Sequence, residues 1–478
     1  MRRTLITAHA RQPRLWLVLL FVLWSSAACT SQAPVAMNPP LTTEGEIFLF
    51  LQPLGEKARP LTFTLANVAV RQPDGVSLPL NLSFKELVGA DRVHTQALLA
   101  RARVPAGMYD GLSLTIARAE IMTEDGPVAL QIAKEPVWLP VAMKIAPKMA
   151  ASFFLTFHAD RSLESHVLFR PVFSVTTSSQ LPLSRLGYIS MPLANTLFIF
   201  HDSDMLFTGV IATGMQPRGL AINRQRDWLY SALGESAIAV IDMFRQTSIG
   251  TIRLRPGDDP QEIALNPLGT SLVSANYGSN TVSIVDPVAQ VERGRVVVSD
   301  GPAAVAFSPA GNVAYSMNTL SNTISVIDTE NMKLLTTIRL EESPLKGALN
   351  RTGSNLYVIT ANSPNLLDID LTAGGVVQKI FIGMGARSIL VDTRSVFVYV
   401  GRRNGEISVV DSTIQAAIDT IQVGGSVESM VISDEENFLF ALVPRQNALK
   451  KVNLTSKEVR AKIDLPEQGY AVALAGAR

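Results

Sequence analysis

A short apolar phrase closed by Asp or Asn recurs seven times between residues 186 and 478, at a nearly constant spacing. The closing residues are Asp202, Asp242, Asp286, Asp328, Asp370, Asp411 and Asn453. The steps between them are 40, 44, 42, 42, 41 and 42 residues. Such a period in β-rich sequence indicates the blades of a propeller, because one four-stranded sheet cannot bury both of its faces alone. The sequence therefore predicts an all-β chain with seven blades.

A second pattern runs in phase with the first and marks one strand in each blade. It begins at Pro217, Pro260, Pro302, Pro344, Ala386, Val427 and Gly469. After most of these positions come three residues that alternate large, small and large, as in Leu220-Ala221-Ile222. Alternation in a strand sends successive side chains to opposite faces. We expect these segments to be the innermost strands of the blades.

The last copy of this strand lies almost at the C-terminus, at residues 470–474. The first Asp-closed strand has no such copy before it in the propeller region. We therefore expect residues 470–474 to complete the first blade, beside strands near residues 187–191, 197–201 and 209–212. This pairing closes the ring and removes an exposed sheet edge.

The repeat resembles the YVTN family of seven-bladed propellers, found in bacterial and archaeal envelope proteins. The resemblance is carried by the run Pro302 to Tyr315 (PAAVAFSPAGNVAY), by Ser321 to Asp328 (SNTISVID), and by Tyr357 to Asn362, which is close to the namesake strand. It covers about residues 186–478. It implies the architecture, whereas the activity stays open, since propellers serve as binders, scaffolds and enzymes alike.

The N-terminal residues have the pattern of a targeting segment. Four arginines, Arg2, Arg3, Arg11 and Arg14, precede an apolar run at residues 15–24, which is too short for a membrane span and is typical of a secretory signal. Small residues follow, and then Cys29, in a pattern that resembles a bacterial lipobox. We predict a lipoprotein signal peptide over residues 1–28 and lipidation at Cys29. The alternative is an ordinary secretory signal cut after Ala28.

A lipidated Cys29 has consequences for the mature chain. Because it is the only cysteine, no thiol is left for a disulfide, a metal or a nucleophile. Residues 29–43, which contain three prolines, predict a flexible tether. Thr30 replaces the Asp that lipoproteins use for inner-membrane retention, so the resemblance implies the outer membrane of a bacterial cell envelope.

Residues 44–180 contain strand patterns without the propeller's period. The predicted strands are residues 46–51, 61–71, 93–104, 112–122, 137–145, 151–158 and 167–175. Turn residues separate them, as at Pro73-Asp74-Gly75. This segment predicts a β-sandwich that precedes the propeller, which we place at residues 186–478.

One motif in the sandwich, Val104 to Leu114 (VPAGMYDGLSL), resembles a widespread, uncharacterised domain of envelope lipoproteins. We expect Gly107 to take a positive φ at a turn and Tyr109 to place its ring at the start of the next strand. The resemblance names no ligand for this domain.

Composition and motifs argue against several functions. Lys and Arg number 42 against 41 for Asp and Glu, which gives no basic stripe for nucleic acid. Of the five histidines only His201 falls in the propeller, and no C-x-x-C-H motif is present. We therefore predict no metal ligands, no cofactor and no catalytic residues. The closing Asp residues lie in different blades, so we expect them to accept backbone N–H groups in turns rather than to bind calcium.

The best candidate site is the ring of residues one or two positions after the start of each innermost strand, near the channel mouth. The ring reads Arg218, Gln261 with Glu262, Ala303, Lys346, Arg387, Glu428 and Tyr470. We predict that Arg218, Glu262, Lys346, Arg387, Glu428 and Tyr470 bind a ligand. Arginine forks suit anionic or sugar-like groups. The alternative is that these are solvated residues at loop ends, paired with one another.

Together these features predict a lipid-anchored envelope protein that acts as a binding scaffold for a protein or glycan partner. The leading alternative is a propeller hydrolase of the lactonase type that acts at the channel mouth. A third interpretation is a purely structural role in an envelope complex.

Overall fold

The computed structural model describes residues 38–164, 167–178, 181–433 and 437–476. Cys29, the predicted signal peptide and most of the predicted tether lie outside the described residues. The described residues from 39 to 476 form one compact unit. Within the described part of the chain, no helix is long and apolar enough to cross a membrane. The helical elements are short 3-10 turns: η1 (Glu56–Ala58), η2 (Gly89–Arg92), η3 (Ala159–Arg161), η4 (Leu183–Arg185) and η5 (Pro444–Gln446).

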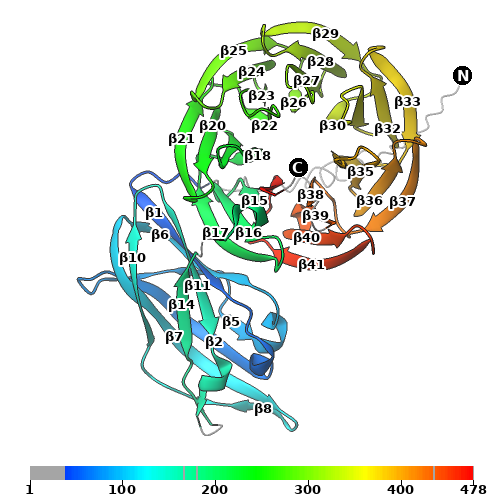
Figure 1. Ribbon diagram of the computed structural model, residues 1–478. Helices are drawn as coiled ribbons and strands as arrows, with labels where there is room; N and C mark the ends of the chain where they lie inside the picture. The colour runs from blue at the N-terminus through cyan, green and yellow to red at the C-terminus, as the bar shows by residue number, and fades with distance from the viewer. Residues whose placement is uncertain (1–37, 165–166, 179–180, 434–436, 477–478) are drawn as a thin grey trace, which may run out of the picture. The chain divides into compact units, whose positions relative to one another are not determined.

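Two sheets face each other in the N-terminal domain (Figure 1). One has the order β14 (Phe173–Thr177), β11 (Ala150–Phe157), β1 (Glu44–Leu51), β6 (Ala97–Pro105) and β4 (Asn81–Leu82). The other has the order β10 (Val137–Ile145), β7 (Gly107–Thr123), β2 (Leu61–Arg71) and β3 (Ser77–Pro79), with β5 (Glu86–Val88) beside β2 and β8 (Gly126–Ala129) beside β7. A small third sheet holds β12 (Leu163–Glu164), β13 (Leu168–Phe169) and β9 (Gln131–Ile132). Side chains of both large sheets share one apolar core.

Two expectations for this domain are wrong in detail. The strand predicted at residues 167–175 is divided into β13 and β14, because Pro171 has no N–H to donate to a ladder. Gly107 does not take a positive φ and instead opens β7. Tyr109 is buried near the start of β7 as expected, and its hydroxyl donates to the carbonyl of Pro105 at 2.8 Å.

Seven four-stranded antiparallel sheets follow, arranged in a ring (Figure 1). Blade 1 holds β42 (Val472–Leu474), β15 (Leu186–Met191), β16 (Thr196–His201) and β17 (Leu206–Ala212), from the centre outward. Blade 2 holds β18 (Pro217–Asn223), β19 (Trp228–Leu233), β20 (Ala237–Asp242) and β21 (Thr247–Arg253). Blade 3 holds β22 (Pro260–Leu265), β23 (Leu272–Asn276), β24 (Thr281–Asp286) and β25 (Val291–Val297). Blade 4 holds β26 (Pro302–Phe307), β27 (Val313–Asn318), β28 (Thr323–Asp328) and β29 (Lys333–Arg339).

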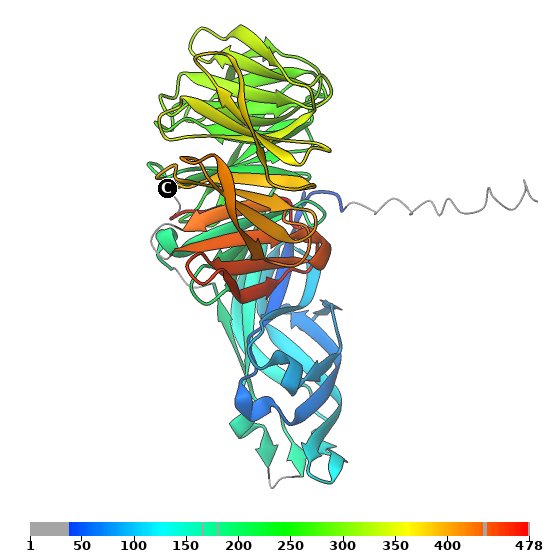
Figure 2. The ribbon, with the colours of Figure 1, turned by 90° about the vertical axis from the view of Figure 1, so that its right-hand side faces the viewer.

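The remaining three blades repeat this order, and Figure 2 shows the blades from the side of the ring. Blade 5 holds β30 (Pro344–Leu349), β31 (Asn355–Thr360), β32 (Asn365–Asp370) and β33 (Gly375–Phe381). Blade 6 holds β34 (Ala386–Val391), β35 (Phe397–Arg402), β36 (Glu406–Asp411) and β37 (Ala416–Gln422). Blade 7 holds β38 (Ser429–Ser433), β39 (Phe438–Val443), β40 (Ala448–Asn453) and β41 (Glu458–Asp464). The predicted fold class, a sandwich followed by a closed seven-bladed propeller, is confirmed.

The C-terminal strand closes the ring as the sequence predicts. β42 pairs antiparallel with β15, with Ile189 opposite Val472 and Gly187 opposite Leu474. Further bonds extend the joint on both sides of this short ladder: Tyr470 donates its N–H to Ser190, and Ala475 donates to Leu186. The inner edge of β15 is therefore covered by the end of the chain.

The Asp-closed phrases end the third strand of each blade, and their side chains serve the following turn. Oδ1 of Asp286 accepts the N–H groups of Val288 and Ala289 at 2.9 Å each. The corresponding residues of the later blades accept backbone N–H groups in the same way, which confirms the turn interpretation. Asp202 departs from the pattern, because it is buried and lies 2.8 Å from the Nε atom of Arg185.

Strand β1 joins the two domains through its two faces. Ile47, Leu49 and Leu51 enter the sandwich core, whereas Phe48 and Phe50 enter an apolar cluster shared with blades 1 and 7. The ring centroid of Phe50 lies 5.4 Å from that of Phe207 in β17. A strand buried on both faces loses the usual polar alternation, which explains its continuous apolar run.

Candidate functional site

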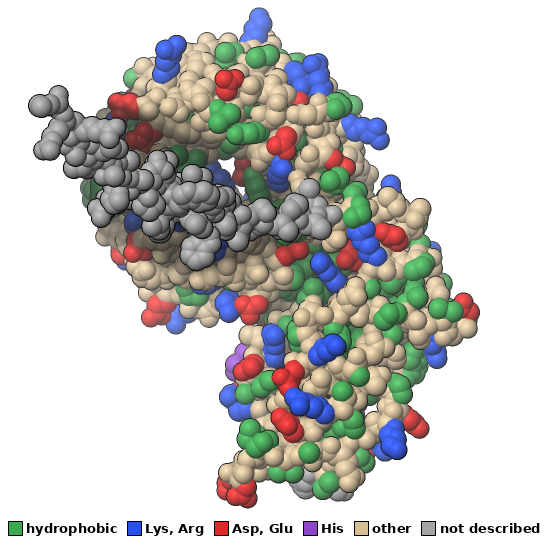
Figure 3. Space-filling model, turned by 180° about the vertical axis from the view of Figure 1, so that it is seen from behind, with side chains coloured by type: hydrophobic (Ala, Val, Ile, Leu, Met, Phe, Trp, Pro, Cys, Tyr) green, Lys and Arg blue, Asp and Glu red, His purple; other side chains and the backbone are tan. Residues whose placement is uncertain are grey.

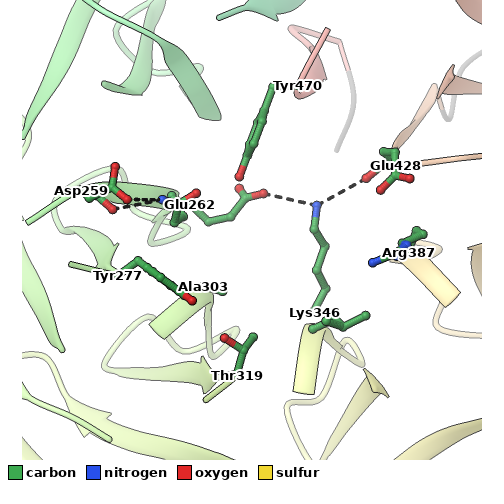
Figure 4. A pocket seen from close by; sticks show the side chains of 11 residues that line it. Asp259, Glu262, Tyr277, Ala303, Thr319, Lys346, Arg387, Glu428 and Tyr470 are labelled. Carbon is green, nitrogen blue, oxygen red and sulfur yellow. Dashed lines mark hydrogen bonds and ion pairs between the residues drawn. The ribbon is translucent and has the colours of Figure 1, made fainter. Parts of the chain in front are cut away.

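A cavity of about 300 Å³ opens at the channel mouth, where the innermost strands begin. Glu262, Lys346, Arg387, Glu428 and Tyr470 line it, and they come from five different blades (Figure 4). The structure thus brings five of the six predicted ligand-binding residues to one cavity. Arg218, the sixth, is not among the lining residues.

A β-bulge at the start of the innermost strand explains how the site is formed. In β34, Ala386 pairs with Arg402 and Ser388 pairs with Gly401, so Arg387 has no partner in the ladder. Blades 2, 3, 4 and 5 have a register shift at the same place. A bulge re-aims side chains that a regular strand would alternate. In blade 3 it allows both Gln261 and Glu262 to line the cavity.

Lys346 reaches across the mouth and connects two blades that do not adjoin its own. Its Nζ atom lies 3.3 Å from Oε1 of Glu262 and 3.5 Å from the backbone oxygen of Glu428 (Figure 4). A Cβ atom on Gly219 would lie 2.6 Å from Oε2 of Glu262, so the carboxylate needs a glycine at this position. The ammonium group of Lys346, in blade 5, thus contacts both blade 3 and blade 7.

Arg218 supports the cavity from behind the lining. Its Nη1 atom lies 2.6 Å from Oδ1 of Asp259, which lines the cavity, and it also donates to the carbonyl of Pro260 at 3.3 Å. Gln261 donates to the second oxygen of the same carboxylate at 2.8 Å. These bonds satisfy Arg218 with protein partners, so the structure gives it a positioning role rather than a place on the cavity surface.

Arg387 differs from the other two cations of the ring. No hydrogen bond or ion pair to its guanidinium occurs among the described residues, and Figure 4 shows it beside Glu428 with no interaction between them. The carboxylate of Glu428, which lies next to Arg387, instead accepts a hydrogen bond from the hydroxyl of Ser426 at 2.5 Å. A half-buried guanidinium without a partner has its donor fork available for an oxyanion.

Tyr470 reaches the mouth only because the C-terminal segment returns to blade 1. Its hydroxyl points toward Glu262 in Figure 4. Burial raises the pKa of Tyr470 far above its usual range, and the nearby charge of Glu262 raises it further. The phenol is therefore neutral at any physiological pH and offers one O–H donor to the cavity.

Sequence reasoning missed four lining residues, Asp259, Tyr277, Thr319 and Leu345. Leu345 lies in β30 beside Lys346. Tyr277 and Thr319 lie in the turns after β23 and β27, and Asp259 lies just before β22. Asp259 directly precedes Pro260, one of the recurring positions that mark the innermost strands. This place in the repeat could have identified Asp259 as a lining residue. The two turns carry no pattern that separates them from other solvated turns.

Other candidate residues do not gather at this site. His201 lies at the end of β16, with Nδ1 3.2 Å from Oδ1 of Asp204. Over the described ranges, no group of three or more His, Cys, Asp or Glu side chains is placed to hold a metal ion. On the face shown in Figure 3, positive and negative side chains are interspersed, in keeping with the balanced composition.

One comparison with known proteins, a match to a family model, agrees with the propeller fold. A family model described as a YNCE-like beta-propeller matches residues 266–469. None of the curated proteins matches the chain. The solved structures similar to it include the hydrazine synthase of Kuenenia stuttgartiensis, at 20% sequence identity and a TM-score of 0.46, with 50% of this chain and 76% of that chain covered.

Proposed function

We propose that this protein is a binding scaffold of the bacterial cell envelope, anchored to the outer membrane through a lipid on Cys29. The propeller presents a ligand or partner site at its channel mouth. The observation that carries the proposal is the convergence of charged and phenolic side chains from five blades on one cavity. The anchor rests on the sequence pattern at residues 15–29.

The chemistry of the mouth favours recognition. Glu262 and Lys346 are paired with each other, and Asp259 is paired with Arg218, so these charges hold the shape of the cavity. Tyr470 supplies a neutral donor and Arg387 an unpaired cation. A few placed polar groups around a preformed hollow are typical of ligand sites.

The shared core of the two domains supports a display role. Phe48, Phe50 and Phe154 of the sandwich pack with Phe198 and Phe207 of blade 1 in one apolar cluster. Large buried apolar contacts oppose relative motion of domains. The propeller that presents the mouth is therefore held rigidly against the sandwich domain.

Photo-crosslinking in intact cells tests the display site. A photoreactive residue replaces Thr319 at the mouth in one variant and Ala310, in the exposed turn that follows the opposite end of β26, in a matched control. We expect discrete adducts from position 319 that increase with illumination, and few or none from position 310. Equal adducts from both positions, or none from position 319, would contradict the proposal.

The anchor has its own test. Globomycin blocks the peptidase that cleaves before a lipobox cysteine, so the unprocessed precursor should accumulate in treated cells. A Cys29→Ala variant should no longer partition with outer-membrane vesicles. Normal processing in the presence of globomycin would refute lipidation at Cys29. It would not affect the proposal that the channel mouth is a binding site.

A further inference from the structure

A second cavity of about 410 Å³ adjoins the channel mouth between blades 5 and 6. Arg387 lines both cavities, so the two share a wall. The other residues important here are Asn362 in the turn after β31, and Arg403 and Asn404 in the turn between β35 and β36. We call this cavity the arginine groove.

The groove has an unbalanced charge. Two guanidinium groups line it, and no Asp or Glu is among the described residues that do so. The first cavity is different, since Asp259, Glu262 and Glu428 offset its cations. Electropositive hollows of this kind concentrate anions.

Arg402, the residue before Arg403 and the last of β35, is an arginine with a structural role. Its Nη1 atom lies 2.7 Å from Oε2 of Glu406, and its Nε atom donates to the carbonyl of Met384 at 3.2 Å. Glu406 also accepts from Asn404 and Gln422, so the nearest carboxylate is fully engaged. Arg403 has no such bond within the described part of the chain.

A backbone hydrogen bond joins the two chain segments that carry Arg387 and Arg403. The N–H of Arg403 donates to the carbonyl of Gly385 at 2.7 Å, which ties the turn of β35–β36 to the segment that begins β34. Gly385 has a φ of 88°, in the left-handed region that favours glycine. The turn that carries Arg403 is thus fastened two residues from Arg387.

We propose that the arginine groove binds an anionic group, a carboxylate or a phosphate, of the ligand that the propeller accommodates. Arg387 and Arg403 supply the charged donors, and the amide of Asn362 lies on the same lining. Planar guanidinium forks match both oxyanions. The inference deepens the proposed function, since it gives the chemical class that this face recognises.

Calorimetric titration of the full-length, detergent-solubilised protein tests the groove. The probes are inorganic phosphate and D-glucuronate, with D-glucose as the neutral control. We expect at least one anion to bind and glucose not to bind. Arg387→Gln and Arg403→Gln should each weaken that binding by about tenfold or more, as expected for a charge-assisted hydrogen bond. The two probes separate a phosphate site from a carboxylate site.

The matched control is Arg351→Gln, which removes an exposed arginine beyond the opposite end of β30. It should bind the anion as the wild type does, and thermal unfolding should show all three variants folded. The inference is overturned if neither anion binds, or if both groove variants bind as tightly as the wild type. The crosslinking experiment from position 319 tests the proposed display function independently of anion binding in the groove.

Discussion

In blades 3 and 4, one buried asparagine side chain forms hydrogen bonds with three Ser or Thr hydroxyl groups. The side chain of Asn318 accepts from Ser316 at 3.0 Å and donates to Thr323 at 3.0 Å and to Ser325 at 2.9 Å. Asn276 makes the same three contacts one blade earlier. Both amides are fully buried, so water cannot replace a lost partner.

Asn318→Ala should therefore lower the free energy of unfolding by about 1–3 kcal/mol, the usual penalty for buried polar groups left unsatisfied. Chemical denaturation measures the change. Asn331→Ala is the control, because its amide bonds Asp328 on the exposed surface and should change stability much less. Equal effects of the two substitutions would show that the buried amide is not important.

Glu46 is a buried acid of β1 whose pKa is raised, chiefly because burial disfavours the carboxylate, although Arg101 opposes the shift. The folded state therefore binds the proton more tightly than the unfolded chain does. Stability contributed by the protonated form is lost as the pH rises from the unfolded pKa through the raised one.

Glu46→Gln should consequently raise the free energy of unfolding at pH 7. In this variant the free energy of unfolding should also fall less steeply as the pH rises above the ordinary carboxyl pKa. Urea denaturation from pH 4 to pH 8 provides the measurement, with Glu124→Gln in an exposed turn as the control. If Glu46→Gln destabilises the protein at pH 7, the attraction between Arg101 and the carboxylate outweighs the cost of burial, and this account of Glu46 is wrong.

At the scale of the element, regular strands were predictable because periodicity is local. The predicted strands at residues 61–71 and 137–145 coincide with β2 and β10. The error at residues 167–175 came from giving apolar content more weight than Pro171. The bulges of the innermost strands were not predictable, because a bulge depends on the pairing of two strands rather than on either sequence.

The candidate site was predictable in its position and not in its pairing. The repeat alone located the ring of residues after the recurring proline. Which cations are satisfied depends on partners elsewhere in the fold: Arg218 meets Asp259 from the next blade, and Arg387 meets none among the described residues. In the same way, the part-buried bond between Arg295 and Asp258 joins residues 37 positions apart, and no sequence motif predicts it.

The joint between the last blade and the first has an unusual residue in β40. Lys451 is buried where most other blades carry an aliphatic or aromatic side chain, and its Nζ atom donates to the backbone oxygen of Asp202 at 2.8 Å. The ammonium also lies 4.1 Å from the ring centroid of Phe438. The contact with Asp202 ties blade 7 to blade 1.

Lys451→Ala should destabilise the propeller by about 2 kcal/mol or more, since it removes a charge-assisted bond and leaves a gap in the packing. Denaturant unfolding measures this loss. Lys333→Ala, on an exposed position of the outermost strand of blade 4, should cost little. A neutral effect of Lys451→Ala would mean that the joint does not depend on this lysine.

At the scale of the whole molecule, the shared apolar cluster couples the sandwich to the propeller. Phe50 packs against Phe154, Phe198 and Phe207, at centroid distances of 5.5, 6.0 and 5.4 Å. Two domains that share buried aromatic side chains should unfold together.

Phe50→Ala should weaken this coupling and cost about 3–5 kcal/mol, as usual for a buried phenylalanine. Differential scanning calorimetry should show one transition for the wild type and two for Phe50→Ala. Phe63→Ala, within the sandwich core alone, destabilises that domain without removing a residue of the shared cluster. Two transitions in the wild type would contradict the coupling.

Closure of the ring is the claim on which the site depends, because only the return of the C-terminal segment brings Tyr470 to the mouth beside Glu262. The most direct measurement is disulfide formation between Ile189→Cys and Val472→Cys in a Cys29→Ser background, where the two new cysteines are the only ones. These residues face each other across β15 and β42. We predict an intramolecular disulfide in the oxidised, folded monomer, identified by peptide mass spectrometry. Free thiols after oxidation, or a disulfide that joins two chains, would contradict the closed propeller.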